Sequence, residues 1–173
     1  MIKVGINGFG RIGRLILRAL LENYEGKILV VGINDLGSIE ANAHLIKFDS
    51  THGTLNQDVK TSSEGFQIGE QNIKVFAEKD PAKLPWGKIG ADVVLECTGF
   101  FLDKTSAGKH IEAGAKKVII SAPAKEVDFT VVQGVNSKDL KKEHNIISNG
   151  SCTTNCLAPV AMVLENTFGI EYG

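Results

Sequence analysis

The feature that most constrains the fold of this chain is a glycine-rich turn near its start. The sequence GFGRIG at residues 8–13 follows the apolar run Ile2–Ile6 and opens the amphipathic stretch Arg11–Glu22. Apolar runs bounded by turn residues are typical of buried strands, whereas apolar residues three and four positions apart are typical of helices. The sequence therefore predicts a strand, a tight turn and a helix in direct succession, as at the start of a dinucleotide-binding fold.

Each glycine of the turn has a separate role in such a unit. Gly8 allows the tight turn, Gly10 lets the backbone approach a pyrophosphate, and Gly13 lets the helix pack closely on the strand. The free amides at the helix start then face the phosphates. Asp35 follows the second apolar run, Ile28–Asn34, where its carboxylate can bind the adenosine ribose and repel a 2′-phosphate. We therefore expect NAD rather than NADP; the alternative is a turn that only joins a strand to a helix, beside a solvated acid.

The rest of the chain alternates apolar runs with amphipathic stretches, which is typical of a doubly wound α/β domain with a mainly parallel sheet. Between residues 51 and 77, glycines separate short alternating pieces, and we expect an antiparallel hairpin excursion there. Further strands are predicted at 92–97, 117–121, 129–133 and 145–148, and helices at 38–47, 104–113, 137–142 and from 151 onward. The expected fold class is Rossmann α/β, ending in a helix that carries Cys152.

The helical stretches also carry local expectations. The first helix has an apolar face that we expect to be buried, formed by Ile12, Leu15, Ile16, Ala19 and Leu20. Ser38 stands at the N-cap position of the second helix. Pro159 lies inside the last helix and predicts a kink there.

Composition and charge exclude several classes of partner. The 173 residues carry a formal net charge of −1, and positive and negative side chains are interspersed along the sequence. The protein therefore has no strong electrostatic field that would attract nucleic acid or an anionic membrane. No apolar run approaches the roughly 18 residues of a membrane span, and Met1 leads into the first strand without a cleavable signal region. We therefore expect a soluble, cytoplasmic protein that binds small molecules.

The three cysteines lack the spacing of a disulfide framework, so we expect free thiols. Cys152 stands at the start of the last helix, where free amides and the helix dipole stabilise a thiolate. Its position alone leaves open a nucleophilic thiol or a buried, inert one. Cys97 and Cys156 are expected to pack as small hydrophobic residues. No metal site is expected, because Cys152 and Cys156 have no further ligand nearby, and no histidine falls in a motif that marks it as a base.

Taken together, the glycine turn and the helix-start cysteine resemble the phosphorylating glyceraldehyde-3-phosphate dehydrogenase family. The likeness extends through essentially the whole chain. Its landmarks are INGFGRIGR (6–14), Asn34-Asp35, KFDSTHG (47–53), ECTG (96–99), SAP (121–123), GVN (134–136) and SCTTNCLAP (151–159). The last of these is the most specific, and the resemblance implies that Cys152 is the catalytic nucleophile.

The same resemblance implies roles for the other site residues. Arg11 and Ile12 would contact the cofactor phosphates, the Lys79 backbone carbonyl would lie near the adenine, and Ser121 would lie beside the nicotinamide. The family more often has arginine at the Lys79 position, a change that a backbone contact tolerates. The whole NAD site would comprise Gly8, Gly10, Arg11, Ile12, Gly13, Asn34, Asp35, Lys79, Thr98 and Ser121. Ser151, Cys152 and Thr153 would meet the substrate.

The implied reaction begins with attack of the Cys152 thiolate on the aldehyde of glyceraldehyde 3-phosphate. Hydride passes to NAD and leaves a thioester on Cys152. Inorganic phosphate then attacks this thioester and releases the acyl group as 1,3-bisphosphoglycerate. Residues 1–150 would form the NAD-binding Rossmann domain, and residues 151–173 would begin a catalytic domain. The family's chains are longer, and the histidine that pairs with the cysteine lies beyond position 173 in them. We therefore expect residues 1–173 alone to bind NAD without turnover, and the parent enzyme to be a homotetramer.

Two alternatives stay open from the sequence. Erythrose-4-phosphate dehydrogenase shares both motifs but uses water for deacylation, so phosphate dependence of the full-length protein would distinguish it. A non-catalytic NAD-binding module would have an inert thiol at Cys152, which its rate of reaction with iodoacetamide would detect. The oligomeric state of the 173-residue chain is not determined by its sequence, but the apolar face formed by Val160, Met162, Val163 and Leu164 is expected to lack cover.

Overall fold

Strands and helices alternate along most of the chain. The strands are β1 (Ile2–Asn7), β2 (Ile28–Asn34), β3 (Phe48–Asp49), β4 (Gly53–Thr54), β5 (Val59–Ser62), β6 (Gly65–Ile68), β7 (Gln71–Phe76), β8 (Val93–Glu96), β9 (Lys117–Ile120), β10 (Phe129–Thr130) and β11 (Ile146–Ser148). The α-helices are α1 (Arg11–Asn23), α2 (Ile39–Lys47), α3 (Trp86–Ile89), α4 (Lys104–Glu112) and α5 (Cys152–Phe168). Two short 3-10 helices are η1 (Pro81–Lys83) and η2 (Ser137–Asp139).

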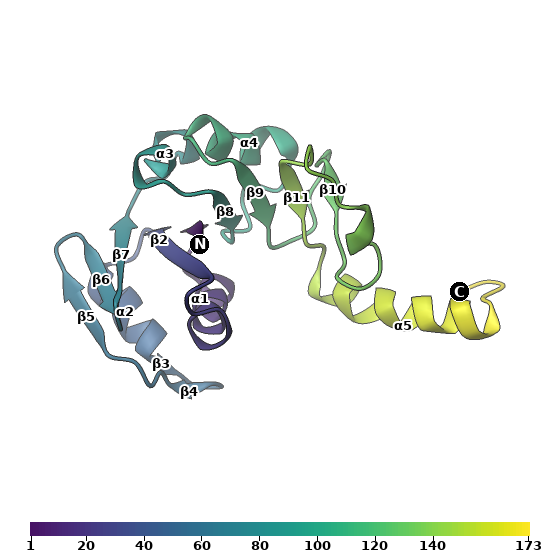
Figure 1. Cartoon of the computed structure of the whole chain (residues 1–173), viewed down its shortest axis with the longest axis horizontal. Coiled ribbons are helices and arrows are strands. Elements are labelled where there is room, and N and C mark those ends of the chain that lie inside the picture. Colours follow the sequence, from purple (N-terminus) through teal and green to yellow (C-terminus); the bar gives the residue numbers. More distant parts are fainter.

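A nine-stranded sheet organises these elements. In the computed structural model, which describes all 173 residues, its order is β10-β11-β9-β8-β1-β2-β7-β6-β5 (Figure 1). Neighbouring strands from β10 to β7 are parallel, whereas β7, β6 and β5 are antiparallel. The direction of winding reverses at β1, which lies between β2 and β8. The doubly wound sheet with an antiparallel excursion is thereby confirmed.

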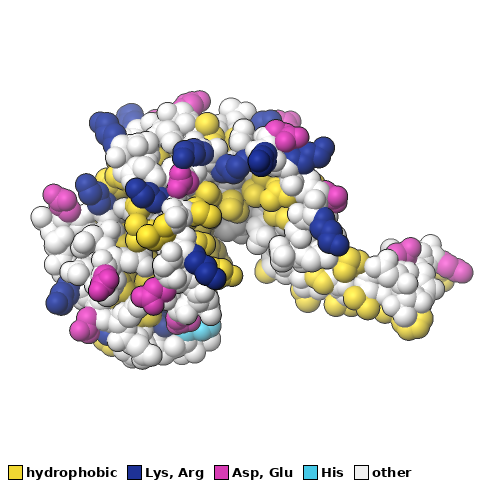
Figure 2. Space-filling model, in the orientation of Figure 1, with side chains coloured by type: hydrophobic (Ala, Val, Ile, Leu, Met, Phe, Trp, Pro, Cys, Tyr) yellow, Lys and Arg dark blue, Asp and Glu magenta, His cyan; other side chains and the backbone are white.

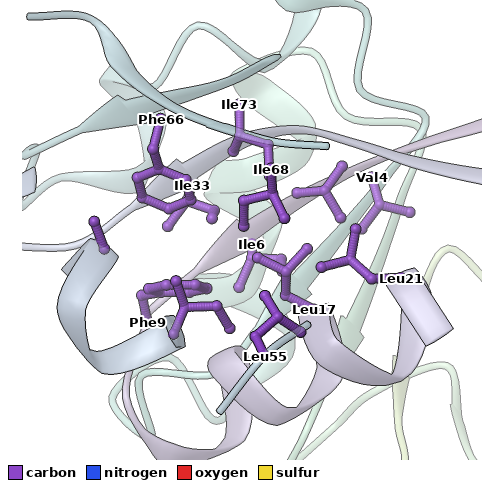
Figure 3. Packing of buried hydrophobic residues seen from close by; sticks show 13 residues of the cluster. Val4, Ile6, Phe9, Leu17, Leu21, Ile33, Leu55, Phe66, Ile68 and Ile73 are labelled. Carbon is purple, nitrogen blue, oxygen red and sulfur yellow. The ribbon is translucent and has the colours of Figure 1, made fainter. Parts of the chain in front are cut away.

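At β8, in the middle of the parallel strands, both faces of the sheet are covered. Along β8, Val93 and Leu95 pack against one hydrophobic cluster and Val94 belongs to another, as alternate residues of a strand must when both faces are buried. The larger cluster joins the sheet to α1 and to the antiparallel strands (Figure 3). Its labelled members include Ile6, Leu17, Leu21, Ile33, Phe66, Ile68 and Ile73. The second cluster includes Trp86 of α3.

Of the face predicted for the first helix, Leu20 packs against the larger cluster, and Leu15 and Ile16 are half-buried. Ile12 and Ala19 are exposed. The buried residues of α1 are Gly13, Leu17, Arg18 and Leu21. Gly13 determines this orientation of the helix, because a Cβ on Gly13 would lie 2.2 Å from the carbonyl oxygen of Gly8. Arg18 is tolerated inside because its guanidinium donates hydrogen bonds of 2.9 to 3.1 Å to the backbone carbonyls of residues 46, 47 and 53.

Two predicted elements are shorter than expected, and one predicted cap is confirmed. The predicted helix 137–142 is only the single turn η2, because the Lys141 amide donates to His144 Nδ1 at 3.2 Å instead of to the Ser137 carbonyl. The predicted strand 129–133 ends at Thr130, because the Asn136 side chain bonds the backbone of residues 130 and 132. Ser38 is the N-cap of α2, and its hydroxyl accepts the Ala41 amide at 3.1 Å.

One partly exposed ion pair predicts how stability depends on pH. Asp128 pairs with Lys104 at 2.6 Å and accepts the amides of Asn145 and Ile146 at 2.8 and 2.9 Å. These interactions lower the pKa of Asp128 to about 2, with the Lys104 hydrogen bond contributing most. Because this pKa lies below the unfolded value, the carboxylate stabilises the fold fully above pH of about 4 and loses this effect as the pH falls towards about 2.

We therefore expect Asp128→Asn to lower the free energy of unfolding by about 1 kcal/mol at neutral pH. The difference from the wild type should shrink below pH of about 4. Urea unfolding across this pH range measures both effects. Asp139→Asn, at an exposed carboxylate, is the control and should change little. A difference that is independent of pH would contradict the assignment.

Candidate functional site

A cleft of about 500 Å³ opens at the carboxyl ends of β1, β2 and β8. Ligands of doubly wound sheets bind at such a reversal point. The cleft is lined by Asn7, Gly8, Gly10, Asn34, Asp35, Leu36, Glu78, Lys79, Cys97, Thr98, Phe100 and Phe101. The structure thus brings together these residues of the predicted cofactor site: Gly8, Gly10, Asn34, Asp35, Lys79 and Thr98. A second groove, of about 430 Å³ over β5, β6 and β7, contains none of the predicted site residues.

The glycine turn forms one wall of the cleft and leaves room for a ligand. Gly8 has a φ of +91°, and a Cβ there would lie 2.8 Å from the Thr98 amide nitrogen. Gly10 differs, because a Cβ built on it meets no atom within 4 Å. The missing side chain of Gly10 therefore leaves open space at the helix start. This space fits a pyrophosphate approaching the backbone.

The start of α1 presents backbone amides rather than a charged side chain. Gly10 is the N-cap, and no side chain caps the helix. The Arg11 guanidinium is paired with Asp49. The amides of His52 and Thr51, together with Arg11, lower the pKa of Asp49 to about 2, so this carboxylate stays ionised and keeps the pair. Any phosphate contact by Arg11 and Ile12 is therefore expected from their amides.

Asp35 connects the glycine turn to the end of β2. Its Oδ2 accepts the Phe9 amide at 2.8 Å, and its Oδ1 accepts the Gly37 amide at 2.8 Å. The side chain is half-buried at the edge of the cleft. Each carboxylate oxygen can accept two hydrogen bonds, so Oδ2 retains an acceptor site for a ribose hydroxyl.

The helix-start position predicted for Cys152 is confirmed. Cys152 is the first residue of α5, and the hydroxyl of Ser151, the N-cap, accepts the Thr154 amide at 2.9 Å. The Cys152 side chain is exposed and forms no hydrogen bond. Ser121, Ser151, Cys152 and Thr153 do not line the cleft. They follow β9 and β11, which continue the same edge of the parallel sheet beyond β8.

The other two cysteines differ from each other. Cys97 is half-buried, and this burial raises the pKa of its thiol to about 11, in keeping with the inert role expected of it. Cys156 is exposed, so the prediction that it packs in a core is wrong. The reason is that α5 extends away from the sheet and has no buried residue (Figure 1).

The apolar face of α5 is uncovered, as expected. Figure 2 shows hydrophobic side chains along the arm that this helix forms. Val160 and Val163 are 55% and 58% exposed. No group of three or more His, Cys, Asp or Glu side chains is arranged to hold a metal ion.

Sequence reasoning missed part of the cleft wall. Leu36 and Phe100 line it although they are 62% and 83% exposed. Glu78, Phe101 and Asn7 were also missed. Their common signal is position, because each lies at or just after the carboxyl end of a strand, on the edge where the ligands of such sheets bind.

Comparison with known proteins agrees with this geometry. Residues 2–104 match the model of the glyceraldehyde 3-phosphate dehydrogenase NAD binding domain, and residues 151–173 match the model of the C-terminal domain of the same enzyme. The chain belongs to the glyceraldehyde 3-phosphate dehydrogenase family. Because the first match is to an NAD binding domain and covers the glycine turn, the cleft and Asp35, NAD is the cofactor of this domain.

Full-length members of the family are similar over nearly the whole chain. Glyceraldehyde-3-phosphate dehydrogenase of Xanthobacter flavus is 54% identical over 172 residues, which cover 99% of this chain and 51% of that protein. The Zymomonas mobilis enzyme of the same name is 56% identical over 173 residues, with the same coverage. Glyceraldehyde-3-phosphate dehydrogenase 1 of Bacillus subtilis is 54% identical. The chain spans about half the length of these curated relatives. None of its helices has the length and apolar character needed to cross a membrane.

Proposed function

We propose that the chain is the NAD-binding part of a phosphorylating glyceraldehyde-3-phosphate dehydrogenase, with Cys152 as its nucleophile. The observation that carries this proposal is the position of Cys152. The cysteine begins a helix at the same edge of the parallel sheet as the glycine turn and Asp35. A thiol at a helix start and a dinucleotide cleft along one sheet edge suit an aldehyde oxidation that passes through a covalent intermediate.

The cofactor residues act by binding and orientation. The amides at the start of α1 face the pyrophosphate, and the space at Gly10 admits it. Asp35 accepts the adenosine ribose hydroxyls, and Lys79, Thr98 and Ser121 complete the site along β7, β8 and β9. NAD, when bound, accepts the hydride.

The thiol residues act on the aldehyde. The Cys152 thiolate attacks the carbonyl carbon of glyceraldehyde 3-phosphate and forms a hemithioacetal, with Ser151 and Thr153 beside it. Loss of hydride from that carbon leaves a thioester on the Cys152 sulfur. Inorganic phosphate then attacks the thioester carbon, and the thiolate leaves as 1,3-bisphosphoglycerate forms. The start of α5 places free backbone amides and the positive end of the helix dipole beside the Cys152 sulfur.

For the parent protein we also propose a homotetramer in the cytoplasm, and a domain boundary at residue 150. Support for the boundary is that β11 ends at Ser148 and that α5, from Cys152 onward, buries no residue against the sheet. The uncovered face of α5 is the kind of surface that associates with further protein.

The experiment is a pair of measurements on residues 1–173. Isothermal titration should show one NAD site per chain. A steady-state assay with glyceraldehyde 3-phosphate, NAD and phosphate should show no turnover, because no side chain of the chain hydrogen-bonds the Cys152 thiol to act as its base. Cys152→Ser, with Cys156→Ser as the matched control, identifies the thiol that iodoacetamide modifies fastest.

Three outcomes would contradict the proposal. Absence of NAD binding would reject the cofactor site. Phosphate-dependent NADH production by the 173-residue chain would reject the predicted lack of turnover. Equal alkylation of Cys152 and Cys156 would favour a non-catalytic NAD-binding module.

A further inference from the structure

Three polar side chains meet at the ends of adjacent strands and are buried there. Asn34 ends β2, Asn7 ends β1 and Glu96 ends β8, and Asn7 is in register with both of the others. The exposed fractions of Asn34, Asn7 and Glu96 are 5%, 1% and 1%. A carboxylate this deep is rare unless hydrogen bonds satisfy it. The hydrogen-bond donors that surround the Glu96 carboxylate therefore indicate what this residue holds in place.

One chain of hydrogen bonds reaches Glu96 from the helices. The Trp86 indole N–H can only donate, and it lies 3.0 Å from His110 Nδ1. His110 Nδ1 therefore accepts, and the N–H of the ring is on Nε2. His110 Nε2 lies 2.9 Å from Glu96 Oε2 and donates to it. Trp86 thus fixes the His110 tautomer, and Glu96 must be the acceptor.

A second chain reaches Glu96 from the opposite wall of the cleft. The backbone of Glu78 fixes the Asn34 amide, because the Glu78 N–H donates to Oδ1 and the Glu78 carbonyl accepts from Nδ2, both at 2.8 Å. Asn34 Nδ2 also donates to Asn7 Oδ1 at 2.7 Å. Asn7 Nδ2 then donates to Glu96 Oε2 at 2.6 Å. In this second series of hydrogen bonds, as in the first, the last group donates to Glu96.

Thr98 provides the remaining donors. Its amide donates to Glu96 Oε1 at 2.7 Å, and its hydroxyl donates to the same oxygen. Four donors therefore converge on one carboxylate, two on each oxygen. These donors fill the two acceptor positions of each oxygen. Thr98 in turn lies against the glycine turn, since a Cβ on Gly8 would be 2.8 Å from the Thr98 amide nitrogen.

We propose that Glu96 is the positioning residue of the cofactor cleft. Its carboxylate holds Thr98, on which the Gly8 turn rests, and it holds Asn7 and Asn34, which precede the turn and Asp35. It thereby sets the distance between the wall that faces the pyrophosphate and the wall that faces the ribose. Glu96 does not itself line the cleft, so it acts on NAD through these neighbours. The inference rests on the proposed NAD-binding function of the cleft.

The test compares NAD affinity with stability in isosteric and control variants of the 173-residue chain. Glu96→Gln places an NH₂ group against two donors and is expected to raise the Kd for NAD about tenfold or more. Val94→Ala lies on the same strand and is fully buried in the core. Val94→Ala should lower the unfolding midpoint about as much as Glu96→Gln does. It should leave the Kd of the folded chain for NAD within about twofold of wild type.

A second pair of variants keeps the test decisive if Glu96→Gln does not fold. His110→Gln can accept from Trp86 and donate to Glu96, so it should keep the Kd near wild type, whereas His110→Leu should raise it about fivefold. A wild-type chain that binds no NAD would overturn the proposed function. Two results would overturn the positioning role while leaving the proposed function in place. One is a Kd for NAD that is the same in Glu96→Gln as in the wild type. The other is a Kd that is the same in His110→Leu as in His110→Gln.

Discussion

Gly10→Ala is expected to leave the fold intact and to weaken NAD binding about tenfold or more. The backbone of Gly10 is extended, with φ −70° and ψ −158°, so alanine is conformationally acceptable there. The added Cβ would project into open space beside the helix start. Loss of stability should stay below about 1 kcal/mol, the range for changing an N-cap residue. The same methyl group would occupy the position where we expect the pyrophosphate to meet the α1 amides.

Gly13→Ala, three residues further on, should lower both the stability of the fold and the affinity for NAD. Its Cβ would lie 2.2 Å from the Gly8 carbonyl oxygen, a backbone atom that cannot move without distorting the turn. Overpacking of this kind costs about 1–3 kcal/mol or more. We expect a lower urea midpoint and, because the turn shifts, lost NAD binding as well.

The control for both variants is a glycine with ordinary surroundings. Gly108 lies inside α4, and a Cβ there would be 3.7 Å from Ile146 Cδ1. Gly108→Ala should raise stability by about 1 kcal/mol, the difference in helix propensity, and leave the Kd for NAD unchanged. Calorimetric titration and urea unfolding give both quantities. Wild-type affinity in Gly10→Ala would falsify the placement of the pyrophosphate, and wild-type stability in Gly13→Ala would contradict the helix–strand contact.

The sequence predicted the parts of the site that depend on local backbone chemistry. The glycine turn needs a left-handed residue at Gly8 and the absence of a Cβ at Gly13, and these requirements are visible in the motif itself. Asp35 and Ser38 follow from their position at the end of a strand and the start of a helix. Such features are encoded within a few residues, so they could be found without the tertiary structure.

The parts that were missed depend on contacts between distant residues. The buried face of α1 was predicted from apolar spacing, but the Gly13 contact and the carbonyls around Arg18 determine it. A buried arginine looks like a surface residue in a sequence. His110 falls in no motif that marks it as a base, and its partner Glu96 is 14 positions away, so nothing in the sequence shows that they meet.

The interpretation of Cys156 was wrong for a related reason. Cysteine is usually buried, but burial requires an opposing surface, and α5 has none in this chain. The same absence explains why a helix with so many apolar residues buries none of them. A pattern of apolar residues therefore predicts that a face can be buried, whereas the partner that buries it has to be known separately.

Asp35→Asn is expected to raise the Kd for NAD about tenfold or more, and to lower the preference for NAD over NADP. Hydrogen bonds to a charged acceptor contribute about 1.5–3 kcal/mol, which corresponds to roughly 10- to 100-fold in affinity. The carboxylate also repels a 2′-phosphate, and asparagine does not. Calorimetric titration of the variant with both nucleotides gives the two Kd values.

The ratio of these Kd values is the more informative quantity. Asp35 also accepts the Phe9 and Gly37 amides, so the variant will be less stable, and a partly unfolded sample would weaken both nucleotides equally without changing their ratio. Glu78→Gln is the matched control, because it removes a negative charge from the same cleft. If the two variants shift the ratio equally, the general negative potential of the cleft sets the preference. A shift confined to Asp35→Asn means that direct contact between this carboxylate and the ribose sets it.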